Sequence, residues 1–290
     1  MTNYAALWRA RWRLLRPGNA AMAAVGVLVG VVLATPGDLL IDEDVRARFV
    51  AGSAAALAAF LLTAFGNVLN DLRDVRIDRE VHPDRPLPAG DISMGQAQAF
   101  AALLLGFGLW EAWVAAGVRT LAFAAANTGL LVLYELRLKR LGLVGNVTVG
   151  ALVASTFCFG AFAVEPAWRD WGAVWSLAAM ALLVNVAREL LKDIQDLEGD
   201  REDRRTFPMR AGRPLTLVLA FLLVNVAVAL SVAAFIGSPW SAWWGLPLFA
   251  ADGAFIVAAA YGWIDVRAAQ GGLKGAMLLA LLAFLAGPLL

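Results

Sequence analysis

Long apolar runs fill most of this sequence, and they restrict its possible folds more than any other feature. A helix needs roughly 20 mostly apolar residues to cross the hydrocarbon core of a bilayer. Nine runs suit this length, and we expect membrane-spanning helices at 18–35, 49–70, 95–116, 119–136, 143–165, 171–190, 214–237, 241–263 and 274–290. Composition agrees, because 61% of the 290 residues are hydrophobic and 16% are charged, whereas soluble domains contain roughly 25% charged residues. The sequence therefore predicts an all-α polytopic membrane protein with nine transmembrane helices in one domain, 1–290.

The distribution of Lys and Arg predicts the orientation, because cytoplasmic loops carry an excess of these residues. If the N-terminus lies inside, 20 of the 24 Lys and Arg residues also lie inside, and four lie outside: Arg46, Arg48, Arg119 and Arg169. This count places Lys274 in the inside loop before the last span. We expect a multi-pass protein of the cell (plasma) membrane with a cytoplasmic N-terminus and an external C-terminus. A net charge of +1 gives no general attraction to nucleic acid, and no obligate protein partner is evident.

Two acidic clusters with the same spacing follow the second and sixth expected spans. They are Asp71, Asp74 and Asp78 in "NDLRDVRID", and Asp193, Asp196 and Asp200 in "KDIQDLEGD", 122 residues later. Equal spacing at equivalent spans indicates a duplicated four-helix unit. The expected pseudo-repeats are approximately 15–140 and 141–265, with 274–290 as an extra helix.

The spacing of each cluster predicts a metal site on one helix face. Positions i, i+3 and i+7 of a helix lie within about 60° of one another. Three carboxylates so close repel one another, and the C-terminal end of a helix disfavours anions. A bound divalent cation offsets both effects, and oxygen ligands suit Mg²⁺. We expect the two trios to converge on a single pocket on the cytoplasmic side.

Cationic side chains on the same side of the membrane complete a site for a diphosphate. Lys and Arg donors bind phosphate oxygens while acids hold the metal. The general excess of Lys and Arg in cytoplasmic loops is an alternative explanation for each of these cations. The candidates are Arg85, Lys139, Arg140, Arg204 and Arg205.

At these residues the sequence resembles the UbiA superfamily of intramembrane prenyltransferases. The family's first motif, N-D-x-x-D-x-x-x-D, is matched by Asn70 and the three acids after it, and Asp196 and Asp200 match its second, D-x-x-x-D. The resemblance covers nearly the whole chain. It implies nine helices, two Mg²⁺ ions held by the two motifs (Asn70 among the ligands), a polyprenyl diphosphate donor, and a lipophilic acceptor. The prenyl tail would lie among the helices or in a lateral opening to membrane lipid.

The resemblance also points to residues outside the acid motifs. "LLRPGN" is similar to the entry to the family's first helix, and "YELRLKRLGLVGN" is similar to the segment between its fourth and fifth helices. The substrate-binding candidates that follow are Arg16, Asn19, Tyr134 and Lys139. Asn67 lies one helical turn before Asp71 and should share its face, unless it makes only a polar helix–helix contact. Lys192 stands where the first motif has Asn70, so the two halves are not equivalent, and we add it to the candidates.

Within the family, "HPDRPLPAGDIS" and "KDIQDLEGDR" most resemble the digeranylgeranylglyceryl phosphate synthase branch. That branch transfers a geranylgeranyl group to geranylgeranylglyceryl phosphate in ether-lipid synthesis. A quinone-ring or chlorophyll-type acceptor remains an alternative. His82 falls in this stretch, either as a base or simply as a loop residue beside Pro83.

Two other classes of protein stay open at this point. A membrane metal or ion transporter also has intramembrane acids and internal repeats, but here the acids gather at one membrane face. An alcohol phosphotransferase also uses helix-borne acids and a metal, but with Gly and Arg inside its acid motif. Neither cluster contains that arrangement.

Overall fold

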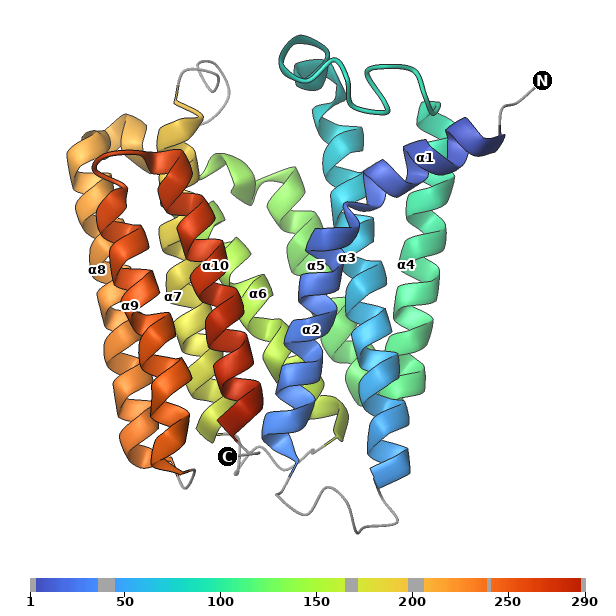
Figure 1. Ribbon diagram of the computed structural model, residues 1–290. Coiled ribbons are helices and arrows are strands. Elements are labelled where there is room, and N and C mark those ends of the chain that lie inside the picture. The colour runs from blue at the N-terminus through green and yellow to red at the C-terminus, as the bar shows by residue number, and fades with distance from the viewer. Residues whose placement is uncertain (1–3, 36–44, 165–171, 198–205, 239–240, 288–290) are drawn as a thin grey trace.

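The computed structural model describes residues 4–35, 45–164, 172–197, 206–238 and 241–287, and within these ranges all regular structure is helical. The α-helices are α1 (Tyr4–Leu15), α2 (Pro17–Ala34), α3 (Val45–Val81), α4 (Met94–Ala116), α5 (Val118–Leu136), α6 (Leu143–Val164), α7 (Gly172–Gln195), α8 (Phe207–Gly237), α9 (Gly245–Tyr261) and α10 (Val266–Ala286). Two short 3₁₀ turns, η1 (Leu138–Arg140) and η3 (Ala242–Trp244), join them. The helices from α2 to α10 form an upright bundle (Figure 1).

The prediction of an all-α membrane fold is confirmed, although the count of nine spans is approximate. In the described ranges, eight helices are long and apolar enough to cross a membrane. The expected span at 119–136 is α5, which is not among the eight. Its 19 residues include Arg119, Asn127 and Glu135, and these polar groups lower its hydropathy.

Three differences between the helices and the sequence prediction bear on the site. Helix α3 continues past the apolar run to Val81, so the first acid cluster lies on the helix itself. Helix α1 was not predicted, because its 12 residues are too few to span a bilayer. Its exposed Trp8 and Trp12 suit a membrane interface.

The third difference moves Lys274 from the expected loop into a helix. The carboxylate of Asp265 accepts hydrogen bonds from the backbone N–H groups of Arg267 and Ala268, which caps the start of α10. The helix therefore begins at Val266, eight residues before Lys274. The predicted boundary at residue 274 is wrong because this polar cap precedes the apolar part of the helix.

The two helix ends next to the acid clusters, those of α3 and α7, lie on the same side of the bundle. In Figure 1 the later ends of α3 and α7 point to the end of the bundle where α1 lies, and α10 finishes at the opposite end. Because α1 and the end of α10 are on opposite sides, an odd number of crossings separates them.

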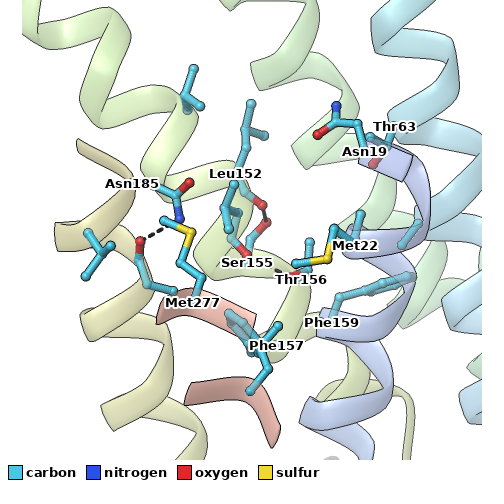
Figure 2. A pocket seen from close by; sticks show the side chains of 18 of the residues that line it. Asn19, Met22, Thr63, Leu152, Ser155, Thr156, Phe157, Phe159, Asn185 and Met277 are labelled. Atoms are coloured by element: carbon cyan, nitrogen blue, oxygen red, sulfur yellow. Dashed lines mark hydrogen bonds between the residues drawn. The ribbon is translucent and has the colours of Figure 1, made fainter. Parts of the chain in front are cut away.

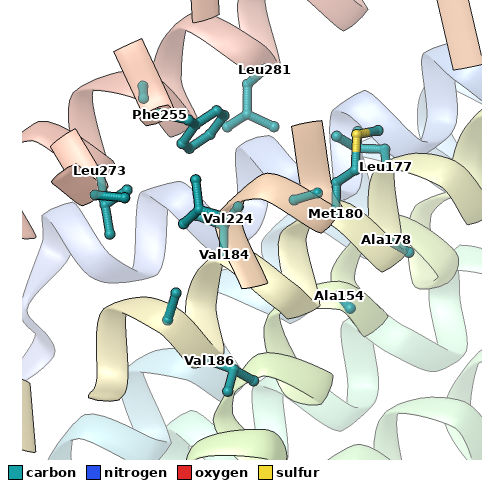
Figure 3. Close-up of a cluster of buried hydrophobic side chains, with 14 of the residues drawn as sticks. Ala154, Leu177, Ala178, Met180, Val184, Val186, Val224, Phe255, Leu273 and Leu281 are labelled. Carbon is teal, nitrogen blue, oxygen red and sulfur yellow. The ribbon is translucent and has the colours of Figure 1, made fainter. Parts of the chain in front are cut away.

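The largest hydrophobic core lies among α6, α7, α8, α9 and α10. Figure 3 shows Val184 of α7, Val224 of α8, Phe255 of α9 and Leu273 of α10 packed together. Smaller clusters fill the half formed by α1 to α5, mostly with Ala, Leu and Phe. Small residues let neighbouring helices approach closely in membranes, and this packing fixes the helices that carry polar side chains.

Helices α2 and α6 approach each other closely. A Cβ atom built on Gly30 would lie 2.0 Å from the carbonyl oxygen of Phe157, and one built on Gly160 would lie 1.9 Å from that of Val27. The contact is reciprocal, since each helix places a glycine against the backbone of the other. Only glycine fits at these two positions without moving a helix.

Candidate active site

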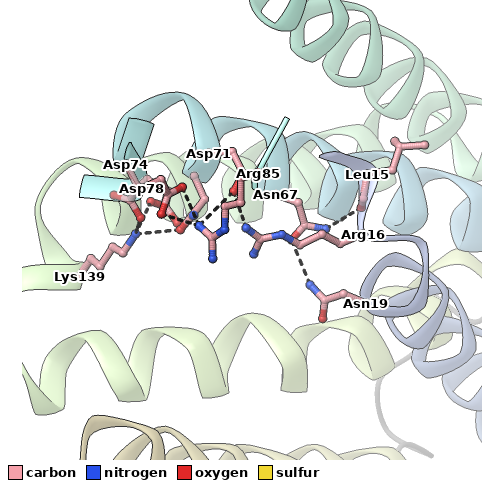
Figure 4. A network of polar contacts seen from close by, with 11 residues as sticks. Leu15, Arg16, Asn19, Asn67, Asp71, Asp74, Asp78, Arg85 and Lys139 are labelled. Atoms are coloured by element: carbon pink, nitrogen blue, oxygen red, sulfur yellow. Dashed lines mark hydrogen bonds and ion pairs between the residues drawn. The ribbon is translucent and has the colours of Figure 1, made fainter. Parts of the chain in front are cut away.

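The three acids of the first cluster lie together at the end of α3. Asp71 and Asp78 are each only 3% exposed, and Asp74 is partly buried. Figure 4 shows all three carboxylates on the same side of the helix, as the sequence predicted. Their mutual repulsion requires nearby positive charge.

Two arginines supply part of that charge. Arg85 folds back from the turns after α3 and donates to both carboxylate oxygens of Asp78, at 2.7 and 2.8 Å. The same guanidinium lies 3.7 Å from Asp71. Arg16, which lies at the junction of α1 and α2, also forms an ion pair with Asp71 (Figure 4). Charge-assisted contacts between Arg and a carboxylate are stronger than neutral hydrogen bonds.

Lys139 supplies the third positive charge, from η1. Its ammonium lies 2.6 Å from Asp74 and 2.7 Å from the side-chain oxygen of Asn70. It also lies 3.4 Å from Glu135, one helical turn earlier in the chain. Lys139 therefore joins the α5–α6 connection to the acid face of α3. Arg140, the next residue, is exposed.

Asn19 and Asn67 position the start of α2 against α3. The Asn67 side chain donates to the backbone carbonyl of Leu15 at 2.8 Å, and Asn19 donates to the side-chain oxygen of Asn67 at 3.1 Å. These bonds hold the turn that carries Arg16, whose backbone adopts the left-handed region at φ 48°. Asn67 thus has the structural contact considered as its alternative role, and it also lines the cavity described below.

The second acid cluster is arranged differently from the first. Helix α7 ends at Gln195, and Asp196 follows directly, with its backbone N–H still donating to the carbonyl of Lys192 at 2.9 Å. Asp193 thus lies within the helix and Asp196 just past its end, and the expectation of three acids on one helix face stays a prediction. Asp193 accepts a hydrogen bond of 2.8 Å from Asn146 of α6. Lys192 is exposed.

Three predicted residues lie outside the described part of the chain, namely Asp200, Arg204 and Arg205. Among the described residues, no three Asp, Glu, His or Cys side chains are grouped so as to hold a metal ion. His82 is exposed in the turns after α3.

A cavity of about 650 Å³ begins beside the first cluster and continues between the helices. Its wall includes five predicted residues: Arg16, Asn19, Asn67, Asn70 and Tyr134. Beyond them the wall becomes mainly apolar. Figure 2 shows Leu152, Phe157 and Phe159 around this part, together with Met22 of α2. A molecule with a charged group at one end and a long hydrocarbon chain at the other would match the polar and apolar parts of this wall.

Several polar side chains of the wall were not predicted. They are Asn127, Asn185, Arg188, Asp252 and Lys274. Each stands alone within an apolar run or was counted as a loop cation, so no motif marked it. The only signal in the sequence was the presence of isolated polar residues within membrane spans, where such residues are costly and often functional.

Two comparisons with known proteins involve most of the chain. The model of the UbiA prenyltransferase family matches residues 23–287. A digeranylgeranylglyceryl phosphate synthase from Methanoculleus marisnigri is 43% identical over 237 residues, covering 81% of this chain and 78% of that protein. The synthase from Methanopyrus kandleri is 39% identical over 284 residues, covering 96% and 98%.

Solved structures give the same fold. One, from work on digeranylgeranylglyceryl phosphate synthase in membranes, superposes with a TM-score of 0.75 at 30% identity and covers 97% of this chain and 98% of that one. A UbiA homologue from Archaeoglobus fulgidus, bound to GPP and Mg²⁺, gives 0.68 at 17% identity and covers 97% and 100%. At 17% identity, the likeness to the Archaeoglobus fulgidus structure shows a shared fold alone. The family match and the identity to curated relatives show that this chain belongs to the UbiA prenyltransferase family and is a membrane prenyltransferase.

Proposed function

We propose that this protein transfers a geranylgeranyl group from geranylgeranyl diphosphate to geranylgeranylglyceryl phosphate, in ether-lipid synthesis. The observation that carries the proposal is the 43% and 39% identity to two digeranylgeranylglyceryl phosphate synthases. The cavity supports it, because a charged rim around the first acid cluster leads into an apolar interior of the kind that a prenyl chain requires.

We propose that Mg²⁺ is the cofactor, held by Asn70, Asp71, Asp74, Asp78, Asp193, Asp196 and Asp200. The donor set fits, since carboxylate and amide oxygens are the ligands that Mg²⁺ prefers. When bound, the metal would neutralise charge on the diphosphate. Arg85 and Lys139 now compensate the acids of α3, and the guanidinium of Arg85 has further N–H donors for phosphate oxygens. Arg140, Lys192 and Arg204 remain proposed contacts to the diphosphate.

The proposed reaction exchanges one C–O bond for another. The allylic C–O bond of the donor breaks, and its electron pair leaves with the diphosphate. The hydroxyl oxygen of the acceptor bonds to the same carbon and gives its proton to the departing diphosphate, which yields an ether and protonated diphosphate. The six acids of the two motifs take catalytic roles in this proposal, by binding the leaving group through the metal. Apolar residues of the cavity exclude water, which would otherwise capture the prenyl carbon.

We further propose that the site faces the cytoplasm at the cell membrane, with the C-terminus outside, on the strength of the excess of Lys and Arg inside. The equal spacing of the two acid clusters supports two pseudo-repeats, approximately 15–140 and 141–265, followed by one extra helix. No partner beyond the donor, the acceptor and membrane lipid is needed for this activity.

A direct assay tests the acceptor and the metal together. Purified protein in detergent receives labelled geranylgeranyl diphosphate and one of two acceptors, geranylgeranylglyceryl phosphate or 4-hydroxybenzoate, which is an aromatic quinone precursor. We expect the labelled ether with the first acceptor, no product with the second, and no product after chelation of Mg²⁺. Product from the aromatic acceptor alone would overturn the proposed function in favour of quinone-type chemistry.

A further inference from the structure

Lys274 is a positive charge inside a membrane-spanning helix. It is the ninth residue of α10, which runs from Val266 to Ala286. A charge at such a position is costly in a bilayer and usually has a functional partner. Its side chain contributes to the wall of the cavity described above. The excess of cations in cytoplasmic loops therefore does not account for it.

The cations beside the first acid cluster are already compensated. Arg85 and Lys139 lie within 2.7 Å of carboxylates of α3, and Arg16 is paired with Asp71. By contrast, no ion pair or hydrogen bond of the Lys274 side chain exists among the described residues. Its charge is available to an anion that enters the cavity.

A second cation of the cavity wall belongs to α7. Arg188 also lines the cavity, and one of its terminal nitrogens lies 2.5 Å from the carboxylate of its neighbour Glu189. A guanidinium has five N–H donors, so this single contact leaves most of them for another acceptor.

The helix geometry brings these two cations to the same level. Figure 2 shows Asn185 of α7 and Met277 of α10 close together at the cavity. The two helices run in opposite directions (Figure 1). Arg188 lies three residues after Asn185 and Lys274 three residues before Met277, and each step is about 4.5 Å along its helix. Both steps lead toward the end of the bundle that carries the acid clusters.

We propose that Arg188 and Lys274 bind the phosphate of the acceptor, an inference that rests on the proposed function. The reaction brings two anionic groups into one cavity, the diphosphate of the donor and the phosphate monoester of the acceptor. Because like charges repel, the second group requires cations of its own. Arg and Lys both bind phosphate through charge-assisted hydrogen bonds. The α7–α10 wall would thus select a phosphorylated acceptor over a neutral one.

Assays of several variants with each of two acceptors test this assignment. Purified protein in a phosphate-free detergent is assayed with geranylgeranylglyceryl phosphate and with geranylgeranylglycerol, which lacks the phosphate. The ratio of the two kcat/KM values measures the preference for phosphate. We expect Lys274→Gln and Arg188→Gln each to lower this ratio about 10-fold or more, the size of one lost charge-assisted hydrogen bond. Lys274→Arg should retain most of the preference.

The matched control is Arg267→Gln, which removes an exposed cation seven residues earlier on the same helix and outside the cavity wall. We expect it to leave the ratio unchanged, and all three Gln variants to leave KM for geranylgeranyl diphosphate within about twofold of the wild-type value. A melting temperature for each variant separates loss of binding from loss of folding. If one variant does not fold, the other provides the same test from a different helix.

The outcomes separate the two proposals. If the wild type transfers to neither acceptor, the proposed function fails. If it transfers well to the phosphorylated acceptor but the ratio is unchanged in both variants, the phosphate assignment alone fails. It also fails if the variants raise KM for the donor instead. Inhibition of the wild type by added phosphatidic acid, lost in Lys274→Gln without a change in the acceptor ratio, would assign the two cations to bulk membrane lipid.

Discussion

The ammonium of Lys139 lies 2.6 Å from the carboxylate of Asp74, which joins the turn between α5 and α6 to the acid face of α3. Seven residues later, Asn146 donates to Asp193 at 2.8 Å. One short segment, from η1 into α6, therefore contacts an acid of each motif. We expect the relative position of the two motifs to depend on it.

The first prediction concerns the charge of Lys139. Lys139→Met removes a donor from the diphosphate side of the cavity, and we expect kcat/KM to fall about 100-fold or more, as when one preorganised donor to developing negative charge is removed. Lys139→Arg should recover part of the activity. Arg137→Gln, at an exposed position two residues earlier, is the control. Equal activity of Lys139→Met and wild type would remove this residue from the proposed site.

The second prediction concerns the acids. Asp74→Asn and Asp196→Asn each replace a carboxylate of the proposed metal site with an amide of nearly the same shape. We expect turnover to be abolished while membrane insertion and detergent extraction stay normal. Activity over a range of Mg²⁺ concentrations, together with the yield of extracted protein, provides the measurement. Near-normal activity of either variant at saturating Mg²⁺ would contradict its role as a ligand.

The third prediction concerns Arg85 and protein stability. The side chains of Asp71 and Asp78 are each 4% exposed, and Arg85 contacts both. Arg85→Gln leaves a buried carboxylate without its partner, and we expect a loss of about 1–3 kcal/mol in the free energy of unfolding. The control is Arg13→Gln, because the pair of Arg13 with Asp91 is 51% and 45% exposed, and exposed pairs contribute at most about 1 kcal/mol.

Thermal unfolding in detergent distinguishes these two variants. Arg85→Gln should melt at a clearly lower temperature than the wild type, and Arg13→Gln close to it. Similar melting temperatures for both variants would show that the buried pair does not stabilise the fold.

The fourth prediction concerns the contact between α2 and α6. Gly160→Ala places a methyl group against the backbone of Val27, and overpacking of this kind costs about 1–3 kcal/mol. We therefore expect a lower yield of folded protein and a lower melting temperature. Gly253→Ala is the matched control, since a Cβ atom on this helical glycine of α9 meets nothing within 4 Å. It should melt at or above the wild-type temperature, because alanine favours helix.

The sequence predicted the fold class and the first acid cluster because both depend on local patterns. Apolar runs of a given length define the spans, and the spacing of Asp71, Asp74 and Asp78 gives a common helix face. Their cationic partners come from distant segments, 55 residues away for Arg16 and 65 for Lys139. Spacing alone cannot identify such pairs. Arg16 became a candidate through the family resemblance, and Lys139 through the side of the membrane on which it was expected as well as through the resemblance.

The remaining features depend on tertiary structure or on helix ends. Equal spacing suggested equal geometry for the second cluster, but α7 ends at Gln195 and leaves Asp196 beyond it. The start of α10 was predicted too late, since the capping role of Asp265 was overlooked. The polar residues of the cavity wall, such as Asn127 and Asp252, come from different helices. Only the packed bundle brings them to one surface.

The length of α3 has a consequence for how substrates reach this enzyme. Its 37 residues extend about 55 Å, well beyond the roughly 30 Å of hydrocarbon in a bilayer. Helix α3 thus extends without interruption from the membrane into water, and its carboxylates lie near the end that is in water. An amphiphile that diffuses sideways in the leaflet can react with its head still hydrated and its tail still dissolved in lipid, without ever leaving the membrane.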